Sequence, residues 1–138
     1  MKRNKGFTLL ELLVVIGIIA LLVGIATVSY SAAQLRTRDA RRKADLNAMK
    51  DALEQYYSAT SFVYPATCSD ASTFLKGPWP VDPGSTSYSP FCDADSYYIC
   101  GTMETGSGGN ATSQATDANG TGLAWGNNGA YYCVGNLQ

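Results

Sequence analysis

Residues 7–28, with the sequence FTLLELLVVIGIIALLVGIATV, decide the fold of this 138-residue chain. The run is apolar except for two threonines and Glu11. As a helix it would be about 33 Å long, enough to cross the hydrocarbon core of a bilayer, which is about 30 Å thick. Three basic residues precede it, namely Lys2, Arg3 and Lys5. By the positive-inside rule, we predict a membrane-spanning helix that starts in the cytoplasm and is followed by an exported segment.

Glu11 is the exceptional residue of this run. A carboxylate inside the bilayer costs about 2.5–3.5 kcal/mol, and a plain anchor gains nothing from it. Its position makes sense if the chain is cut between Gly6 and Phe7, because the new amine of Phe7 would lie one helical turn away. The amine of a neighbouring subunit could pair with Glu11 equally well, for about 4 kcal/mol before desolvation. Such pairing would set the register of identical packed helices.

The stretch Lys5–Ile16, KGFTLLELLVVI, strongly resembles the class III signal of type IV pilins and of type II secretion pseudopilins. The resemblance implies that residues 1–6 are a leader, which prepilin peptidase removes after Gly6. It also implies that the new amino terminus at Phe7 is methylated and that Glu11 is the assembly glutamate. Many family members carry a proline late in the apolar segment, whereas residues 23–28 here have none.

Two other interpretations of the apolar run stay open from the residues alone. It could be a secretory signal that is cleaved near the small residues 29–33, or a plain membrane anchor. Neither interpretation gives Glu11 a purpose. We therefore interpret residues 7–28 as the half of a longer helix that spans the membrane and later forms a filament core.

The chain continues as a helix beyond the apolar run. No Pro or Gly occurs from Tyr30 to Tyr57, and apolar residues recur at helical spacing. This stripe consists of Leu46, Met49, Leu53 and Tyr56. We predict one helix from Phe7 to about Tyr57, with an amphipathic half at 29–57 whose stripe carries the exported domain. The aromatic pair Tyr56-Tyr57, followed by Tyr64-Pro65, extends the resemblance to pilins over residues 1–65.

Charge is divided between the two parts of the chain. Residues 1–54 carry a net charge of +4, and residues 55–138 carry −5. Five basic residues gather on the predicted helix: Arg36, Arg38, Arg41, Arg42 and Lys43. We expect a solvated face, or salt bridges to the acidic head of another subunit. A nucleic-acid surface is the other interpretation, but no aromatic platform or phosphate loop supports it.

Residues 58–138 are expected to form an exported globular head. Five prolines exclude a long helix from 58–96, which we interpret as a pinned loop region with one helical turn near 72–76. Strands are predicted at 97–100, 122–125 and 130–134, the last two joined in a hairpin at Asn128-Gly129. Residues 101–122 are poor in apolar side chains and are expected to be a flexible loop. The predicted fold class is α+β, a long helix packed on a small antiparallel sheet.

Four cysteines lie in the head: Cys68, Cys92, Cys100 and Cys133. An exported domain permits disulfides, and four cysteines allow three connectivities. Cys100 and Cys133 both follow a Tyr-Tyr pair on predicted strands, so they could face each other in the sheet. We therefore favour Cys68–Cys92 and Cys100–Cys133.

No catalytic or metal site is expected. The chain has no histidine, which removes the commonest general base and the commonest zinc ligand. We expect no cofactor. A calcium site built from Asp93 and Asp95, with Asp82 or Asp117, is an alternative, although the spacing is far from that of an EF-hand loop.

These patterns together predict a structural subunit of a type IV pilus-like surface filament, not an enzyme. The expected partners are further copies of the chain, prepilin peptidase, the assembly machinery and the inner membrane before assembly. The filament would then lie outside the cell. One alternative is a pseudopilin of a type II secretion system. A second alternative is a small secreted or anchored binding domain held by disulfides.

Overall fold

The structure is a computed structural model that describes residues 6–84 and 86–136. The basic residues Lys2, Arg3 and Lys5, and with them most of the predicted leader, lie outside the described residues. One helix, α1, spans Leu9–Ala59, close to the predicted bounds. Its first part, up to Gln34, forms one compact unit, and the chain from Leu35 onward forms a second. The second unit therefore contains the helix from Leu35 onward, which is most of the predicted amphipathic half, together with the head.

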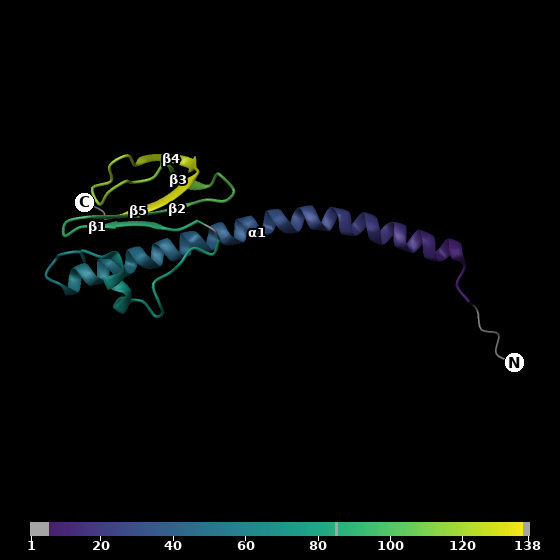
Figure 1. The fold of residues 1–138 in the computed structure, drawn as a ribbon, viewed down its shortest axis with the longest axis horizontal. Helices are drawn as coiled ribbons and strands as arrows, with labels where there is room; N and C mark the ends of the chain where they lie inside the picture. The colour runs from purple at the N-terminus through teal and green to yellow at the C-terminus, as the bar shows by residue number, and fades with distance from the viewer. Residues whose placement is uncertain (1–5, 85, 137–138) are drawn as a thin grey trace. The chain divides into compact units, whose positions relative to one another are not determined.

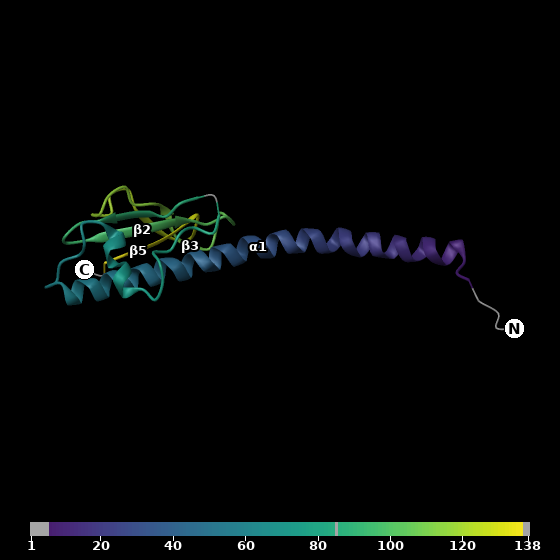
Figure 2. The same ribbon diagram turned by 60° about the horizontal axis from the view of Figure 1, so that its bottom comes forward.

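The head is built on a five-stranded antiparallel sheet. Its strands are β1 (Ser89–Cys92), β2 (Tyr97–Thr102), β3 (Gly109–Ser113), β4 (Ala124–Gly129) and β5 (Tyr131–Gly135). Their spatial order is β1-β2-β5-β3-β4. The sheet lies alongside the part of α1 that belongs to the second unit, as Figures 1 and 2 show. This is the predicted α+β fold class.

The face of the sheet toward α1 forms the main core. Alternation along β2 sends Tyr97 and Ile99 to this face, where both are fully buried with Val134 of β5. The helix contributes the predicted stripe, in which Leu46, Met49 and Leu53 are fully buried and Tyr56 is half-buried. Burying a large apolar side chain contributes about 1.5–3 kcal/mol, so this stripe fixes the head on the helix.

The opposite face of the sheet holds a second, smaller core. Cys100 and Cys133 are direct partners in the antiparallel pairing of β2 with β5. They pack with Ala111 of β3 and with Ala115. Consecutive residues of β2 and β5 thus point to opposite faces of the sheet, and both faces are buried. A shift of one residue would exchange the two cores, so this burial fixes the register of the pair.

Two strand expectations were wrong. The loop predicted at 101–122 contains the end of β2 and all of β3, and the predicted hairpin between β4 and β5 does not form. Instead, β3 lies between them and pairs with both. Glycines permit this close approach, because a Cβ on Gly129 would lie 1.9 Å from the Ala111 carbonyl oxygen. Asn128 does adopt the positive φ expected of it, at 60°, but at the end of β4.

The proline-rich segment is more ordered than the sequence indicated. A 3₁₀ helix, η1, spans Cys68–Phe74, earlier than the turn predicted at 72–76. Strand β1 contains Pro90, which a central strand would not accommodate. Proline has no backbone N–H to donate to a neighbouring strand. Because β1 lies at the edge of the sheet, with a strand on one side only, it can accommodate Pro90.

Tyrosines close the end of the helix against the head. Tyr64 stacks on Tyr57 with ring centroids 4.4 Å apart and meets Tyr97 edge to face at 4.9 Å. Both Tyr64 and Tyr97 donate hydrogen bonds to the Glu54 carboxylate, the Tyr97 bond being 2.8 Å long. Burial, followed by the neighbouring Glu54 carboxylate, raises the pKa of Tyr64 to about 12.

Candidate functional site: the start of the helix and the buried arginine

The first turn of α1 is closed by a capping box. The backbone N–H of Thr8 donates to Glu11 Oε2 at 2.9 Å, and the N–H of Glu11 donates to Thr8 Oγ1 at 3.2 Å. The Thr8 hydroxyl also donates to Glu11 Oε2, at 2.9 Å. This reciprocal pattern satisfies two backbone donors that a helix start otherwise leaves without partners. Glu11 thus has a local role in starting the helix, in addition to the one predicted from the sequence.

The two residues of the predicted cleavage site lie just before this turn. Gly6 and Phe7 precede the helix, and Phe7 is 89% exposed. No atom outside its chain neighbours lies within 4 Å of the position that a Cβ on Gly6 would occupy. The peptide bond between Gly6 and Phe7 therefore lies before the helix, and the side chain that follows it is exposed.

The first unit exposes its apolar side chains on all sides of the helix. Leu12, Leu13, Ile16, Leu21 and Ile25 are each more than half exposed, and the same holds for most of their neighbours. The segment is long and apolar enough to cross a membrane. A helix that is apolar all round needs a lipid or protein environment to cover it.

The comparisons with known proteins bear on this segment. Residues 1–27 match the family model described as the prokaryotic N-terminal methylation motif. The chain carries the prepilin methylation motif. The resemblance drawn from Lys5–Ile16 is therefore confirmed.

The matches to two similar proteins are longer than the methylation motif. The type IV major pilin protein PilA of Myxococcus xanthus (strain DK1622) is 38% identical over 56 residues, covering 41% of this chain and 26% of that protein. A fimbrial protein of Pseudomonas aeruginosa is 43% identical over 54 residues, covering 39% of this chain and 35% of that protein. The chain thus spans about a quarter to a third of the length of the curated relatives it matches. No solved structure matches the chain significantly.

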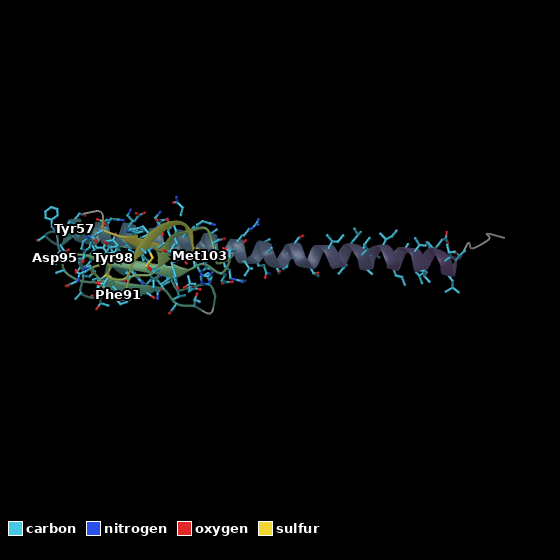
Figure 3. All side chains as sticks on the ribbon, turned by 90° about the horizontal axis from the view of Figure 1, so that it is seen from above. Tyr57, Phe91, Asp95, Tyr98 and Met103 are labelled. Atoms are coloured by element: carbon cyan, nitrogen blue, oxygen red, sulfur yellow. A yellow bond between two sulfur atoms is a disulfide. The ribbon has the colours of Figure 1, made fainter. Side chains whose placement is uncertain are left out.

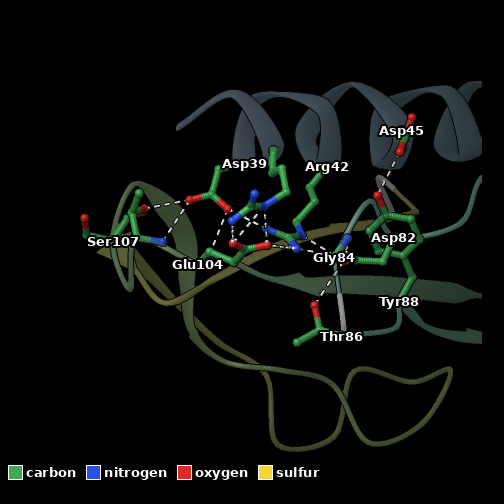
Figure 4. Close-up of polar contacts among 11 residues, drawn as sticks. Asp39, Arg42, Asp45, Asp82, Gly84, Thr86, Tyr88, Glu104 and Ser107 are labelled. Carbon is green, nitrogen blue, oxygen red and sulfur yellow. Dashed lines mark hydrogen bonds and ion pairs between the residues drawn. The ribbon is translucent and has the colours of Figure 1, made fainter. Parts of the chain in front are cut away.

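The second unit holds a polar site that the sequence did not reveal. The Arg42 side chain is fully buried and donates to three carboxylates, those of Asp39, Asp82 and Glu104 (Figure 4). Arg38 also pairs with Glu104. The basic cluster was expected to be solvated or to pair with another subunit, and for Arg38 and Arg42 this was wrong. The missed signal is that Arg42 continues the stripe of Leu46, Met49 and Leu53 by one helical turn.

We call the charged group around Arg42 the ion cluster; it consists of Arg38, Asp39, Arg42, Asp82 and Glu104. Each of its three acids comes from a different segment. Asp39 lies on α1, Asp82 on the loop before β1 and Glu104 just after β2. Asp39 also accepts the backbone N–H groups of Glu104 and Thr105, at 2.8 and 3.0 Å. Asp82 accepts the N–H of Gly84 at 2.6 Å. Arg42 therefore ties two loops of the head to the helix.

The electrostatics of the cluster favour the charged forms. Burial alone would raise the pKa of Asp82, but the hydrogen bonds from Arg42 and Gly84 lower it. The pKa of Asp39 is lowered in the same way, because the hydrogen bonds from Thr105, Glu104 and Arg42 outweigh burial. For Glu104, the hydrogen bonds from Arg38 and then Arg42 lower the pKa. No buried side-chain nitrogen or oxygen in the described part of the chain lacks a hydrogen-bond partner.

The disulfides follow the pairing that the sequence favoured. Cys68 of η1 is bonded to Cys92 of β1, with Cα atoms 5.4 Å apart. Cys100 is bonded to Cys133 across the sheet, with Cα atoms 4.1 Å apart. The first bond fastens the proline-rich segment to the sheet edge, and the second joins the neighbouring strands β2 and β5.

The aspartates of the alternative calcium site do not converge. Asp82 is paired with Arg42, and Asp117 accepts hydrogen bonds within its own turn, from the N–H groups of Asn119 and Thr121. Over residues 6–84 and 86–136, no group of three or more Cys, Asp or Glu side chains is placed to hold a metal ion.

Proposed function

We propose that this chain is the structural subunit of a type IV pilus-like surface filament. Prepilin peptidase would cut between Gly6 and Phe7, removing the leader 1–6, and the amino group of Phe7 would be methylated. The subunit would stand in the inner membrane before assembly and then join a filament outside the cell. Its mechanism is the transfer of an apolar helix from lipid into a bundle of identical helices.

The observation that carries this proposal is the coincidence of the methylation motif with an apolar helix that its own chain leaves uncovered. The motif matches residues 1–27, and the same residues include Leu12–Ala26, which have no polar side chain. Two similar proteins carry the names type IV major pilin and fimbrial protein. These comparisons do not favour the pseudopilin or the secreted binding domain.

The residues have distinct roles in this proposal. Glu11 would neutralise the methylated amine at Phe7 of the adjacent subunit and so set the register of the helices. In the structure, Glu11 Oε2 is held by Thr8, and its other oxygen, Oε1, accepts no hydrogen bond among the residues described. One carboxylate oxygen is thus oriented by the chain itself, while the other is available to an ammonium group. The role of the subunit is structural, and the head would lie on the filament surface.

Mass analysis of native material tests the proposal directly. Filaments sheared from cells and examined by electron microscopy should contain this protein, with Phe7 as its first residue and one added methyl group on the amine. A protein that keeps Met1, or that begins near residues 29–33, would contradict the proposed processing. Recovery of the protein only as dispersed single chains would contradict the filament.

A further inference from the structure

Three cations lie along one flank of α1 in the second unit. Arg36, Lys43 and Lys50 follow one another at intervals of seven residues, which places them on one side of the helix about 10.5 Å apart. In the part of the chain that the structure describes, no carboxylate forms an ion pair with any of the three. Lys43 instead donates to the Gly108 carbonyl at 2.5 Å. We call these three residues the cationic flank.

The cationic flank borders two hollows on the surface of the second unit. Arg36 and Lys43 line one hollow of about 530 Å³ together with Ser107 and Gly108. Lys50 lines the other, of about 220 Å³, together with Trp125 and Asn136. Trp125 is 57% exposed, although it is the kind of side chain that most often anchors an interface. The exposed side chain of Trp125 therefore lies beside the positive charges of the cationic flank.

The head has the opposite surplus. Asp82 and Glu104 of the head form ion pairs within the ion cluster. Asp93 and Asp95, in contrast, are exposed and form no ion pair among the described residues. Both belong to the turn between β1 and β2, which we call the acidic turn. Figure 3 labels Asp95 toward one end of the head and Met103 toward the other. Internal pairing thus leaves one chain with a positive flank and a negative tip.

We propose that the cationic flank docks the acidic turn of a second copy of this chain. Two complementary patches at different places on one molecule give a heterologous contact, which repeats from copy to copy and builds an open helical array. Charge complementarity of this kind guides partners into register and excludes wrong orientations. The inference rests on the proposed filament, and it names the surfaces through which the heads would pack on the helices of their neighbours.

A charge swap in the full-length protein tests the contact. The flank variant Arg36→Glu with Lys50→Glu, and the turn variant Asp93→Lys with Asp95→Lys, should each lower the yield of sheared filaments about tenfold, because like charges would then face each other. The chain that carries all four changes should recover to within about threefold of the wild type, since opposite charges meet again. Lys76→Glu, an exposed change on the head outside both patches, serves as the control and should assemble normally.

Each other outcome overturns the docking. A normal filament yield from the flank variant would overturn the docking. If wild-type filaments then bound a labelled single-stranded oligonucleotide and flank-variant filaments did not, the flank would be assigned to nucleic acid. A loss of filament yield that the four-change chain does not reverse would also overturn the docking, provided that resistance to chymotrypsin, whose aromatic cleavage sites are unchanged, shows both parent variants to be folded. Wild-type filaments with a methylated Phe7 keep the filament proposal standing in either case. Their absence from the wild type would instead contradict the filament, and with it the docking.

Discussion

The guanidinium of Arg42 and the carboxylate of Asp82 form a two-pronged ion pair inside the protein. Arg42 Nε donates to Asp82 Oδ2 and Arg42 Nη2 donates to Asp82 Oδ1, both at 2.8 Å. The Arg42 side chain is fully buried and that of Asp82 is 2% exposed. Such forked pairs fix orientation as well as charge. Here the pair holds the loop before β1 against the helix that carries the whole head.

Replacing Arg42 should be among the most destabilising changes in the head. Arg42→Ala would leave buried carboxylates without their cation, which typically costs about 3–5 kcal/mol of the free energy of unfolding. Arg41→Ala is the matched control, because the Arg41 side chain is 65% exposed and lies 3.9 Å from Asp45. It should cost no more than about 1 kcal/mol. Urea unfolding of the detergent-solubilised chain, followed by tryptophan fluorescence, measures both, and equal effects would refute a special role for Arg42.

The ion cluster should make stability fall in acid. The pKa values of Asp39, Asp82 and Glu104 are lowered in the folded chain, so these groups stabilise it above the unfolded values of about 4. That contribution is lost as the pH falls through the lowered values. The free energy of unfolding should therefore be nearly level from neutral pH to about pH 5 and decrease below about pH 4. Asp82→Asn should flatten this decrease, and an unchanged slope would show that Asp82 does not contribute.

Removing the disulfide between β2 and β5 should loosen β3 as well. Cys100→Ser with Cys133→Ser should lower the free energy of unfolding by about 2–4 kcal/mol. Because Ala111 packs against this pair, hydrogen exchange should speed up in β3 more than in η1. Cys68→Ser with Cys92→Ser is the companion variant, for which faster exchange is expected in η1. The same exchange pattern in both variants would argue against separate roles for the two bonds.

The capping and assembly roles of Glu11 can be separated by a variant that keeps the shape of the side chain and removes its charge. Glu11→Gln keeps a side chain that can complete the capping box but removes the charge. Glu11→Ala removes both. If Glu11 pairs with an ammonium group of a neighbouring subunit, both variants should be inserted and trimmed normally yet yield few filaments. Immunoblots for the trimmed form and sheared-filament yield measure the two steps. Normal assembly of Glu11→Gln would leave only the capping role.

Processing should depend on the absence of a side chain at position 6. Gly6→Leu should leave the full-length precursor, because the added side chain would lie beside the bond to be cut. Gly77→Leu is a suitable comparison, since a Cβ at Gly77 also has nothing within 4 Å. The mass of the protein extracted from membranes distinguishes the two forms. A trimmed product from Gly6→Leu would contradict the cleavage site.

The elements with a local signal could be predicted from the order of the residues. The helix follows from the apolar run, from the lack of Pro and Gly between Tyr30 and Tyr57, and from the stripe that contains Leu46 and Leu53. Each of these signals depends on neighbours along one helix. The motif around Gly6 and Glu11 is likewise contiguous. The Cys100–Cys133 pairing could also be anticipated, because both cysteines lie on strands with apolar, aromatic sequences.

The arrangement of the head could not be predicted, because it depends on contacts between segments that are far apart in the sequence. Strand β3 has the sequence GNATS, without the apolar alternation that marks a strand, and it exists because it fills the space between β5 and β4. Arg42 reads as a surface cation, yet it is buried because three carboxylates from separate segments converge on it. A charge can be buried only where its partners meet it, and that meeting depends on the packing of distant segments rather than on neighbouring residues.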